Sequence, residues 1–344
     1  MLRIKVLPAG CGDCLLVSFG QGNDIKNILI DGGIGATYKK LKPDIELIKS
    51  NNQYIDLLVV THSHDDHING IIKFIEDEKN NDCIKQVWFN SGVHFDREKV
   101  EMLSFTNGLN ISSKKIKYLE DTLLSMNFME NQIWNNKLIM QGHTTKIGDA
   151  SITVLSPDSS SLEKLKLFTK EHRDLDIAGK DYDFSTRLID FNLDKFEADT
   201  SIENSTSISF LFEYNGKRIL FLADSFPEIV TAGLVKTKVL EENNKIDFVK
   251  LSHHASKGNL SDELLESIDC TSFIVSTHGN CSNKLPNKES FARLIKHFKF
   301  INLYFNYNND TIKNIFFEDE LSGKDYRINT YYLPEHNYEI KVEE

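Results

Sequence analysis

Six consecutive residues, His62-Ser63-His64-Asp65-Asp66-His67, constrain this chain more than any other part of its sequence. They directly follow residues 55–60, which are apolar except for Asp56 and are typical of a buried strand. Imidazole and carboxylate groups suit zinc and similar metals, and a loop at a strand end lets several side chains converge. A solvated polar loop rarely concentrates three histidines and two aspartates in this way. The run therefore predicts a metal centre.

The order of side chains within the run predicts two metal positions. His62 and His64 are two residues apart in an extended segment, so they point the same way, as ligands of one metal should. Asp66 and His67 follow where the chain turns into a helix and can address a second metal. We expect two divalent ions, zinc in the first instance, with manganese as the alternative.

Strand and helix signals alternate on both sides of this loop and predict an α/β fold. We expect helices at residues 43–50 and 68–78. Short β-rich runs, several bounded by turn residues, are found at residues 2–7, 14–19, 27–30, 55–60, 84–90, 151–155, 207–214, 218–222, 247–251, 272–276 and 300–305. Two such halves with helices outside predict a four-layer αββα sandwich. We expect one domain over residues 1–344, with polar, partly helical insertions at about 94–140 and 158–203.

Composition limits the environment and the partners. The chain has 344 residues and a net charge of −11, which disfavours wrapping by long nucleic acid, because such binding depends on phosphate neutralisation. No apolar stretch approaches the length of a membrane span, so we expect no membrane partner and a cytoplasmic location. The five cysteines, Cys11, Cys14, Cys83, Cys270 and Cys281, are odd in number and scattered, and we expect them to be reduced thiols.

The histidine run resembles the second signature motif of the metallo-β-lactamase superfamily. The first motif of that family, an aspartate that ends an early strand, is matched by Leu29-Ile30-Asp31-Gly32-Gly33. By resemblance Asp31 orients a ligand histidine. The fourth motif is matched by Asp224, which the resemblance implies bridges two metals. The fifth is matched by Ser252-His253-His254-Ala255-Ser256.

Adjacent histidines after an extended strand point to opposite sides, so we expect only one of His253 and His254 to be a ligand. The spacing typical of the superfamily favours His254. His253 then supports a ligand or faces the substrate.

The third motif departs from the family, which usually has a histidine before the hairpin that leads to the bridging aspartate. Asn204 is nearest to that place, and an amide oxygen is a poorer zinc ligand than imidazole. Several outcomes are open for the position built on His62 and His64. It binds metal weakly, uses Asn204 or water, or recruits His94 or His143 from the insertions. Asp66, His67, Asp224 and His254 form a complete set for the other position.

In the residues that depart from the common family pattern, the chain resembles one branch of the superfamily. This branch is the hydrolase domain of ComEC-type DNA-uptake channels and its soluble relatives. The resemblance rests on Gly12-Asp13-Cys14, on the asparagine and serine before the hairpin, and on the paired histidines. Where relatives have His-Pro, this chain has Leu285-Pro286, and His278 is a candidate substitute for the missing histidine. The resemblance covers roughly residues 1–90 and 145–300.

The resemblance implies hydrolysis by a metal-bound hydroxide, with Asp66 as metal ligand and proton acceptor. We expect a phosphodiesterase or nuclease that acts on a nucleotide signal or on short or single-stranded nucleic acid, with a protein partner encoded in the same multi-gene system. One alternative is an ester, thioester or lactone hydrolase on the same centre. Another is a non-catalytic, metal-binding regulatory subunit.

Overall fold

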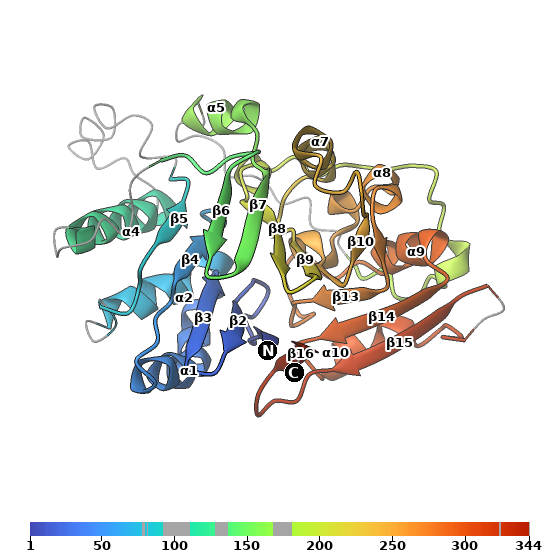
Figure 1. Ribbon diagram of the computed structural model, residues 1–344. Helices are drawn as coiled ribbons and strands as arrows, with labels where there is room; N and C mark the ends of the chain where they lie inside the picture. Colours follow the sequence, from blue (N-terminus) through green and yellow to red (C-terminus); the bar gives the residue numbers. More distant parts are fainter. Residues whose placement is uncertain are drawn as a thin grey trace.

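The computed structural model describes residues 1–77, 80, 82–91, 111–127, 137–167, 181–322 and 325–343. Within these ranges the chain forms two large β-sheets that pack face to face, with helices on the outer face of each (Figure 1). The expected four-layer αββα sandwich is confirmed. No helix in the described ranges is long and apolar enough to cross a membrane.

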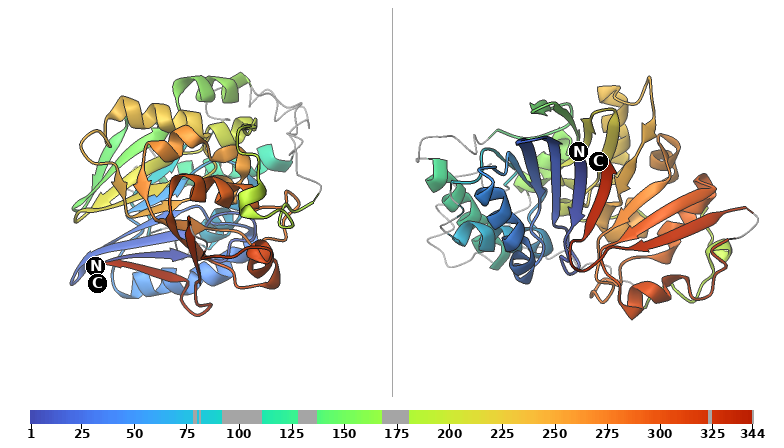
Figure 2. Two further views of the ribbon diagram at one scale, coloured as in Figure 1. Left: turned by 90° about the vertical axis from the view of Figure 1, so that its right-hand side faces the viewer. Right: turned by 60° about the horizontal axis from the view of Figure 1, so that its bottom comes forward.

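The first sheet is built mainly from the N-terminal part of the chain and has the strand order β16-β1-β2-β3-β4-β5. Its strands are β1 (Leu2–Val6), β2 (Leu15–Gln21), β3 (Asp24–Ile30), β4 (Leu57–Val60), β5 (Val87–Phe89) and β16 (Glu339–Glu343). The C-terminal strand β16 pairs antiparallel with β1, so the two ends of the chain lie side by side (Figure 2). β3, β4 and β5 are parallel, which places the loops after β3 and β4 at the same edge of the sheet.

The second sheet has the order β15-β14-β13-β11-β9-β8-β7-β6. Its strands are β6 (Thr144–Ile147), β7 (Ala150–Ser156), β8 (Ser209–Tyr214), β9 (Lys217–Phe221), β11 (Phe248–Lys250), β13 (Ser272–Val275), β14 (Phe300–Phe305) and β15 (Arg327–Tyr332). A small parallel pair, β10 (Lys245–Ile246) and β12 (Asp269–Cys270), extends beside it. The run from β9 to β15 is parallel, so the loops after β9, β11 and β13 again share one edge.

Three apolar clusters hold the layers together. One, which includes Ile4, Val59, Phe210 and Ile219, lies between the two sheets. A second packs the first sheet against α1, α2 and α4, and a third packs the second sheet against α7, α8 and α9. The helices are α1 (Tyr38–Ser50), α2 (Asp65–Glu76), α4 (Ile111–Asn127), α5 (Ser159–Leu167), α6 (Ile202–Ser205), α7 (Pro227–Thr237), α8 (Asp262–Glu266), α9 (Lys288–His297) and α10 (Asp310–Lys313). Burial of apolar area in these clusters is the main favourable contribution to folding.

Several element boundaries differ from expectation. Helix α2 begins at Asp65 rather than near residue 68, because Asp65 and Asp66 are stabilised in the first turn, where backbone N–H groups point outward. Strands β15 and β16 were not expected. β16 pairs with β1 at the other end of the chain, and β15 pairs parallel with β14, the strand that precedes it. The insertion expected at 94–140 contains α4, and the one at 158–203 contains α5 and α6. The remainder of the first insertion lies partly outside the described residues.

The expectation that all five cysteines are reduced is wrong for two of them. Cys11 and Cys281 form a disulfide across 270 residues of sequence, while Cys14, Cys83 and Cys270 are free and buried. The pairing was missed because spacing carries no information about which loops the fold brings together. The bond ties the turn after β1 to the loop after β13. Disulfides persist mainly in oxidising compartments, so the cytoplasmic location stays a prediction.

Candidate metal centre

Loops from the ends of parallel strands converge at one edge of the sandwich. Asp31 directly follows β3, His62 lies two residues after β4, and Asp224 follows β9. His253 and His254 follow β11 in a short 3-10 turn, Ser252–Ala255. Because both sheets direct the carboxyl ends of these strands to the same side, residues from four separate segments meet there. This edge is the place where the sequence predicts a metal centre.

One carboxylate oxygen lies at the middle of the cluster. Asp224 Oδ2 is 3.4 Å from His67 Nε2, 3.6 Å from His254 Nε2, 3.8 Å from His62 Nε2 and 3.9 Å from His253 Nε2. Ligands of one tetrahedral zinc ion are separated by about 3–4 Å, given metal–ligand bonds of about 2 Å. The spacing around Asp224 is therefore that of a metal-ligand set.

Each of these imidazole rings has its other nitrogen, Nδ1, against a group on the outside of the cluster. His67 Nδ1 donates to Asp31 Oδ2 at 2.8 Å, and His254 Nδ1 donates to the carbonyl of Ser276 at 2.8 Å. His62 Nδ1 is 3.1 Å from the hydroxyl of Thr61, which itself donates to Asp31. Acceptors on Nδ1 fix the ring orientation and leave the lone pair of Nε2 for a metal.

The buried atoms at the centre of the cluster lack partners. His62 Nε2, His67 Nε2, His254 Nε2 and Asp224 Oδ1 make no hydrogen bond to any described residue. Buried polar groups without partners are costly and rare in native proteins. The three Nε2 atoms lie within 4 Å of Asp224 Oδ2, so these imidazoles and this carboxylate fit a divalent cation, and imidazole with carboxylate is a donor set that zinc or manganese accepts.

Ligand atoms within 4.8 Å of one another define overlapping groups. One contains His62, His67 and Asp224, and another contains Asp66, His67 and His254. Asp66 Oδ2 lies 3.9 Å from His254 Nε2, and the Asp66 side chain is 30% exposed. The structure thus brings together the ligand residues that the sequence predicts for the second metal position. Among them, Asp66 is partly exposed to solvent.

The pKa values follow from burial and from opposite charges. Burial lowers the pKa of His62 well below its ordinary value, and the neighbouring His67 lowers it further. For His67 burial also acts downward, but the carboxylates of Asp224 and Asp31 outweigh it and raise the pKa. Burial would raise the pKa of Asp224, but His67, His254 and His253 hold it well below its ordinary value. A carboxylate that stays ionised among imidazoles is suited to bind a cation.

The backbone around the cluster adopts left-handed conformations at residues other than glycine. Asp31 has φ 54°, Ala223 has φ 47°, and His253, His254 and Ala255 have φ 43°, 55° and 66°. Such conformations cost of order 1–3 kcal/mol each and are concentrated at functional sites. The strain serves to aim side chains from the strand ends into the cluster.

The expectation that His253 and His254 point to opposite sides is wrong. It assumed an extended backbone, whereas both residues are left-handed and turn the two rings towards Asp224. His254 lies with Asp66 and His67, as the superfamily spacing favours. His253 Nε2 lies 3.9 Å from the same Asp224 oxygen, and the His253 side chain is 14% exposed.

The remaining candidates occupy different places. His64 is half-buried with its ring centroid 4.7 Å from that of His62. Asn204 is buried, and its amide nitrogen donates to Asp199 at 2.7 Å. His278 packs its ring against Tyr307, and His143 packs against Trp88. Among the described residues, no group of three or more converging ligand atoms includes His143, His278, His64 or His253. His94 lies outside the described residues.

Two supporting features were missed in the sequence. Asp13 and Lys250 form an ion pair in which both side chains are 1% exposed, and Asp13 Oδ1 is 3.5 Å from His254 Nδ1. Asp199, in the polar segment before α6, contacts His253. The Gly-Asp-Cys turn could have indicated Asp13, and its Gly12 is required because a side chain there would collide with the Asp66 backbone. No sequence signal indicated Asp199.

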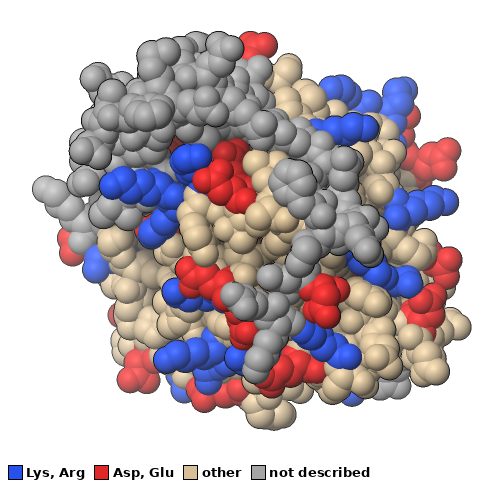
Figure 3. Space-filling view, turned by 90° about the vertical axis from the view of Figure 1, so that its left-hand side faces the viewer, with Lys and Arg blue, Asp and Glu red and all other residues tan. Residues whose placement is uncertain are grey.

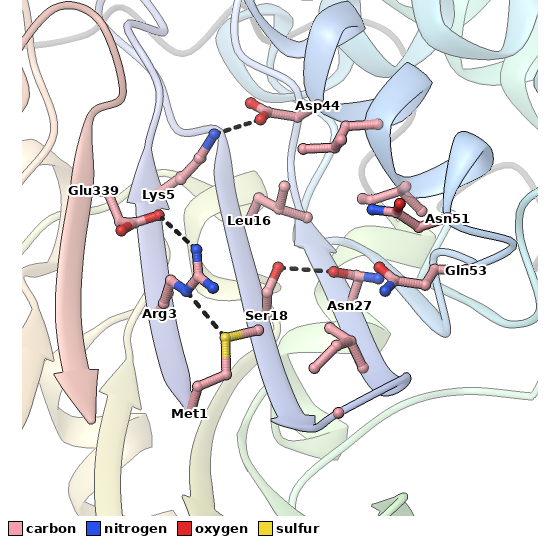
Figure 4. A pocket seen from close by; sticks show the side chains of 14 residues that line it. Met1, Arg3, Lys5, Leu16, Ser18, Asn27, Asp44, Asn51, Gln53 and Glu339 are labelled. Carbon is pink, nitrogen blue, oxygen red and sulfur yellow. Dashed lines mark hydrogen bonds and ion pairs between the residues drawn. The ribbon is translucent and has the colours of Figure 1, made fainter. Parts of the chain in front are cut away.

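A surface cavity of about 490 Å³ lies at the opposite end of the first sheet (Figure 4). It lies between the outer face of β1–β3 and helix α1. Its charged side chains are paired with one another, Arg3 with Glu339 and Lys5 with Asp44. None of the groups of converging ligand atoms found among the described residues includes a residue that lines it. The chemistry of the chain is therefore concentrated at the strand ends.

Several solved structures are similar to this chain. In structure, the chain is similar to the metallo-beta-lactamase fold protein YhfI from Bacillus subtilis, with 10% identity, coverage of 99% of this chain and 100% of that chain, and a TM-score of 0.41. It is also similar to Zn(2+)-bound PqqB from Methylobacterium extorquens, with 10% identity, coverage of 99% and 100%, and a TM-score of 0.42. These similarities are too distant to support an assignment by themselves.

A further similar structure is the class B3 di-zinc metallo-beta-lactamase LRA-12 from an Alaskan soil metagenome, with 13% identity, coverage of 72% of this chain and 76% of that chain, and a TM-score of 0.31. No curated protein matches the chain significantly in sequence. The family model described as the metallo-beta-lactamase superfamily matches residues 12–278, which include every residue of the cluster. The chain belongs to the metallo-beta-lactamase superfamily.

Proposed function

We propose that the chain is a metal-dependent hydrolase that acts on phosphodiesters. The observation that carries the proposal is the set of three buried, unpartnered imidazole Nε2 atoms that lie within 4 Å of Asp224 Oδ2. The proposed ligands of two divalent ions are His62, His64, Asp66, His67, Asp224 and His254. Zinc is proposed first, with manganese as the alternative.

The chain's own residues prepare this centre for hydrolysis. When bound, a metal pair lowers the pKa of water and polarises the scissile bond. Asp224 is placed to share its carboxylate between the two positions, because imidazoles approach it from several sides. Asp66 is held in the first turn of α2 and is partly exposed, so it can accept a proton from attacking water and pass it to solvent.

A centre with two metal positions is better suited to the hydrolysis of a phosphodiester than a centre with a single metal. Two positions that share a carboxylate would suit an in-line displacement, because a bound metal pair would stabilise charge on both the attacking and the leaving oxygen. The net charge of −11 favours a short substrate over long duplex nucleic acid. Figure 3 shows Lys and Arg interspersed with Asp and Glu on the described part of one face, without a continuous basic surface there. We propose a nucleotide signal or a short or single-stranded oligonucleotide.

The test uses purified protein, stripped with a chelator and reloaded with zinc or manganese. Hydrolysis is measured with bis-p-nitrophenyl phosphate, single-stranded oligonucleotides and cyclic dinucleotides. Asp66→Ala should lower turnover by about 10²–10⁴-fold, the usual contribution of a positioned acid–base group, while the protein stays folded. The matched control is Asp65→Ala, because Asp65 is the neighbouring carboxylate and pairs with Lys115 at the surface. This control should retain metal and activity.

Other outcomes would redirect or reject the proposal. Two bound metals with thioesterase or lactonase activity, and no phosphodiesterase activity, would favour the ester alternative. Metal binding without hydrolysis of any tested substrate would favour a regulatory subunit. A metal-loaded Asp66→Ala protein with wild-type turnover would contradict the proposed role of Asp66.

A further inference from the structure

The position built on His62 and His64 is short of a ligand. The residue at the place of the missing third-motif histidine is Asn204, whose amide nitrogen donates to Asp199 Oδ2 at 2.7 Å and lies 3.4 Å from His253 Nδ1. The Asn204 amide nitrogen therefore helps to hold Asp199, which contacts His253 Nδ1, while Asn204 Oδ1 is buried without a hydrogen-bond partner among the described residues. His253 offers an imidazole where the family's own histidine is missing.

We infer that His253 replaces the missing histidine as a ligand of this position, and that Asp199 is the residue that holds it there. The inference rests on the metal centre of the proposed function. It adds one ligand from the fifth motif and one positioning residue from the segment before α6.

The backbone of the fifth motif delivers both histidines to the centre. His253 has φ 43° and ψ 52°, and His254 has φ 55° and ψ 34°. Left-handed residues other than glycine cost roughly 1–2 kcal/mol each, so two in succession need a compensating purpose. Their effect is that both Nε2 atoms come within 4 Å of the same Asp224 oxygen, at 3.9 and 3.6 Å.

The surroundings of His253 Nδ1 leave Nε2 as the ligand atom. Nδ1 lies 3.1 Å from Asp199 Oδ2 and 3.0 Å from Asn259 Oδ1, so its proton is donated outward. The same arrangement is found at His67, whose Nδ1 donates to Asp31. A carboxylate on the outer nitrogen of an imidazole is a common partner of metal-ligating histidines.

Asp199 is itself fixed in orientation. Its Oδ1 accepts from the backbone N–H of Ser201 at 2.9 Å, and its Oδ2 accepts from the amide of Asn259 at 3.0 Å. Its own backbone N–H donates to the carbonyl of Gly258 at 3.0 Å. The carboxylate is therefore fixed in orientation as an acceptor for His253 Nδ1.

The test is calorimetric titration of chelator-stripped protein with zinc and with manganese, with metal content measured by mass spectrometry after dialysis. Wild type should show two binding events. His253→Ala should lose one event and keep the other. Asp199→Asn should weaken the same event by about 10–100-fold, the usual effect of a residue that orients a ligand. His253→Gln serves if the alanine variant does not fold.

The matched control is His143→Ala, which removes a histidine that packs on Trp88 and should retain both events. Two unchanged events in folded His253→Ala and His253→Gln would overturn the inference while leaving the metal centre intact. Loss of an event in Asn204→Ala that is larger than the loss in His253→Ala would also overturn it, in favour of amide ligation. Wild type that binds no metal would instead overturn the proposed function itself.

Discussion

The two proposed metal positions share Asp224 but differ in how their ligands are held. The inner position, Asp66, His67 and His254, has both imidazoles fully buried, with Nδ1 against a carboxylate or a backbone carbonyl. The outer position is His62, His64 and His253. Its His62 has only the Thr61 hydroxyl at Nδ1, and His64 and His253 are partly exposed.

This difference follows from the elements that supply the supporting groups. Asp31 and Ser276 follow β3 and β13 of the two sheets, so the inner position is held by the sandwich itself. Asp199 belongs to the polar segment between β7 and β8, so the outer position depends in part on an insertion. Each position has one imidazole held by a carboxylate, so the difference lies in solvent exposure. Because His64 and His253 are partly exposed, we expect the inner position to bind metal more tightly.

The largest effect is expected from a change to Asp224, the residue that the two proposed metal positions share. Asp224→Asn should weaken metal binding at both positions and lower hydrolysis by more than about 100-fold, because loss of a shared ligand exceeds the 10–100-fold cost of losing a residue that orients one. Metal content and turnover of the purified variant check this. An Asp224→Asn protein that holds two metals would show that the positions do not share this carboxylate.

A second change tests the buried ion pair between Asp13 and Lys250, which lies next to His254. Asp13→Asn leaves the Lys250 ammonium buried and without its partner charge, which should cost roughly 3–5 kcal/mol in the free energy of unfolding. Asp13→Leu combined with Lys250→Met should recover most of this loss, because a buried ion pair is often replaceable by apolar residues. Denaturant unfolding of the metal-free protein measures both. Equal stability of wild type and Asp13→Asn would contradict the account.

The same pair predicts a pH dependence. Burial would raise the pKa of Asp13, but Lys250 and His254 outweigh it and lower it from 3.8 to about 2. Because the pKa of Asp13 is lower in the folded state than in the unfolded state, its ion pair with Lys250 stabilises the fold above about pH 4. This stabilisation is lost as the pH falls towards 2. Acid unfolding of the metal-free wild type should show this loss, and the Leu/Met double variant should lack it. The same acid sensitivity in both proteins would exclude Asp13 as its source.

A smaller effect should distinguish the two positions. Asp31→Asn removes the carboxylate that accepts from His67 Nδ1, so affinity at the inner position should fall by about 10–100-fold. Competition titration with a chromophoric chelator measures both affinities. If the weaker event falls and the tighter one does not, the assignment of inner and outer positions is reversed.

The smallest effect is expected at Thr61. Thr61→Val removes the hydroxyl beside His62 Nδ1, and we expect a loss of affinity near the lower limit, about 10-fold, mainly at the outer position. The valine is similar in size, so stability should change little. A loss at the inner position larger than that at the outer one would show that Thr61 acts through Asp31 instead.

Local patterns predicted most of the residues that the fold brings together at the strand ends. A buried apolar strand followed by His62 to His67 fixes which residues lie at the strand end, and Asp31 and Asp224 occupy equivalent places after β3 and β9. These features depend on residues close together in sequence. The four-layer sandwich was predicted for the same reason, from the alternation of short strands and helices around the histidine run.

The outer position was predicted less well because it depends on contacts between distant segments. The directions of His253 and His254 follow from left-handed backbone at residues other than glycine, which no spacing rule indicates. Asp199 lies in a polar segment without strand periodicity. The Cys11–Cys281 disulfide and the pairing of β16 with β1 likewise join opposite ends of the chain.

The most direct test of the account is anomalous diffraction from crystals of the zinc- or manganese-loaded protein, which locates each metal. We predict two peaks on either side of Asp224, each about 2 Å from its ligand atoms. The inner peak should contact His67 and His254, and the outer peak should contact His62 and His253. A single peak, or an outer peak bound by Asn204 with His253 turned away, would contradict the account.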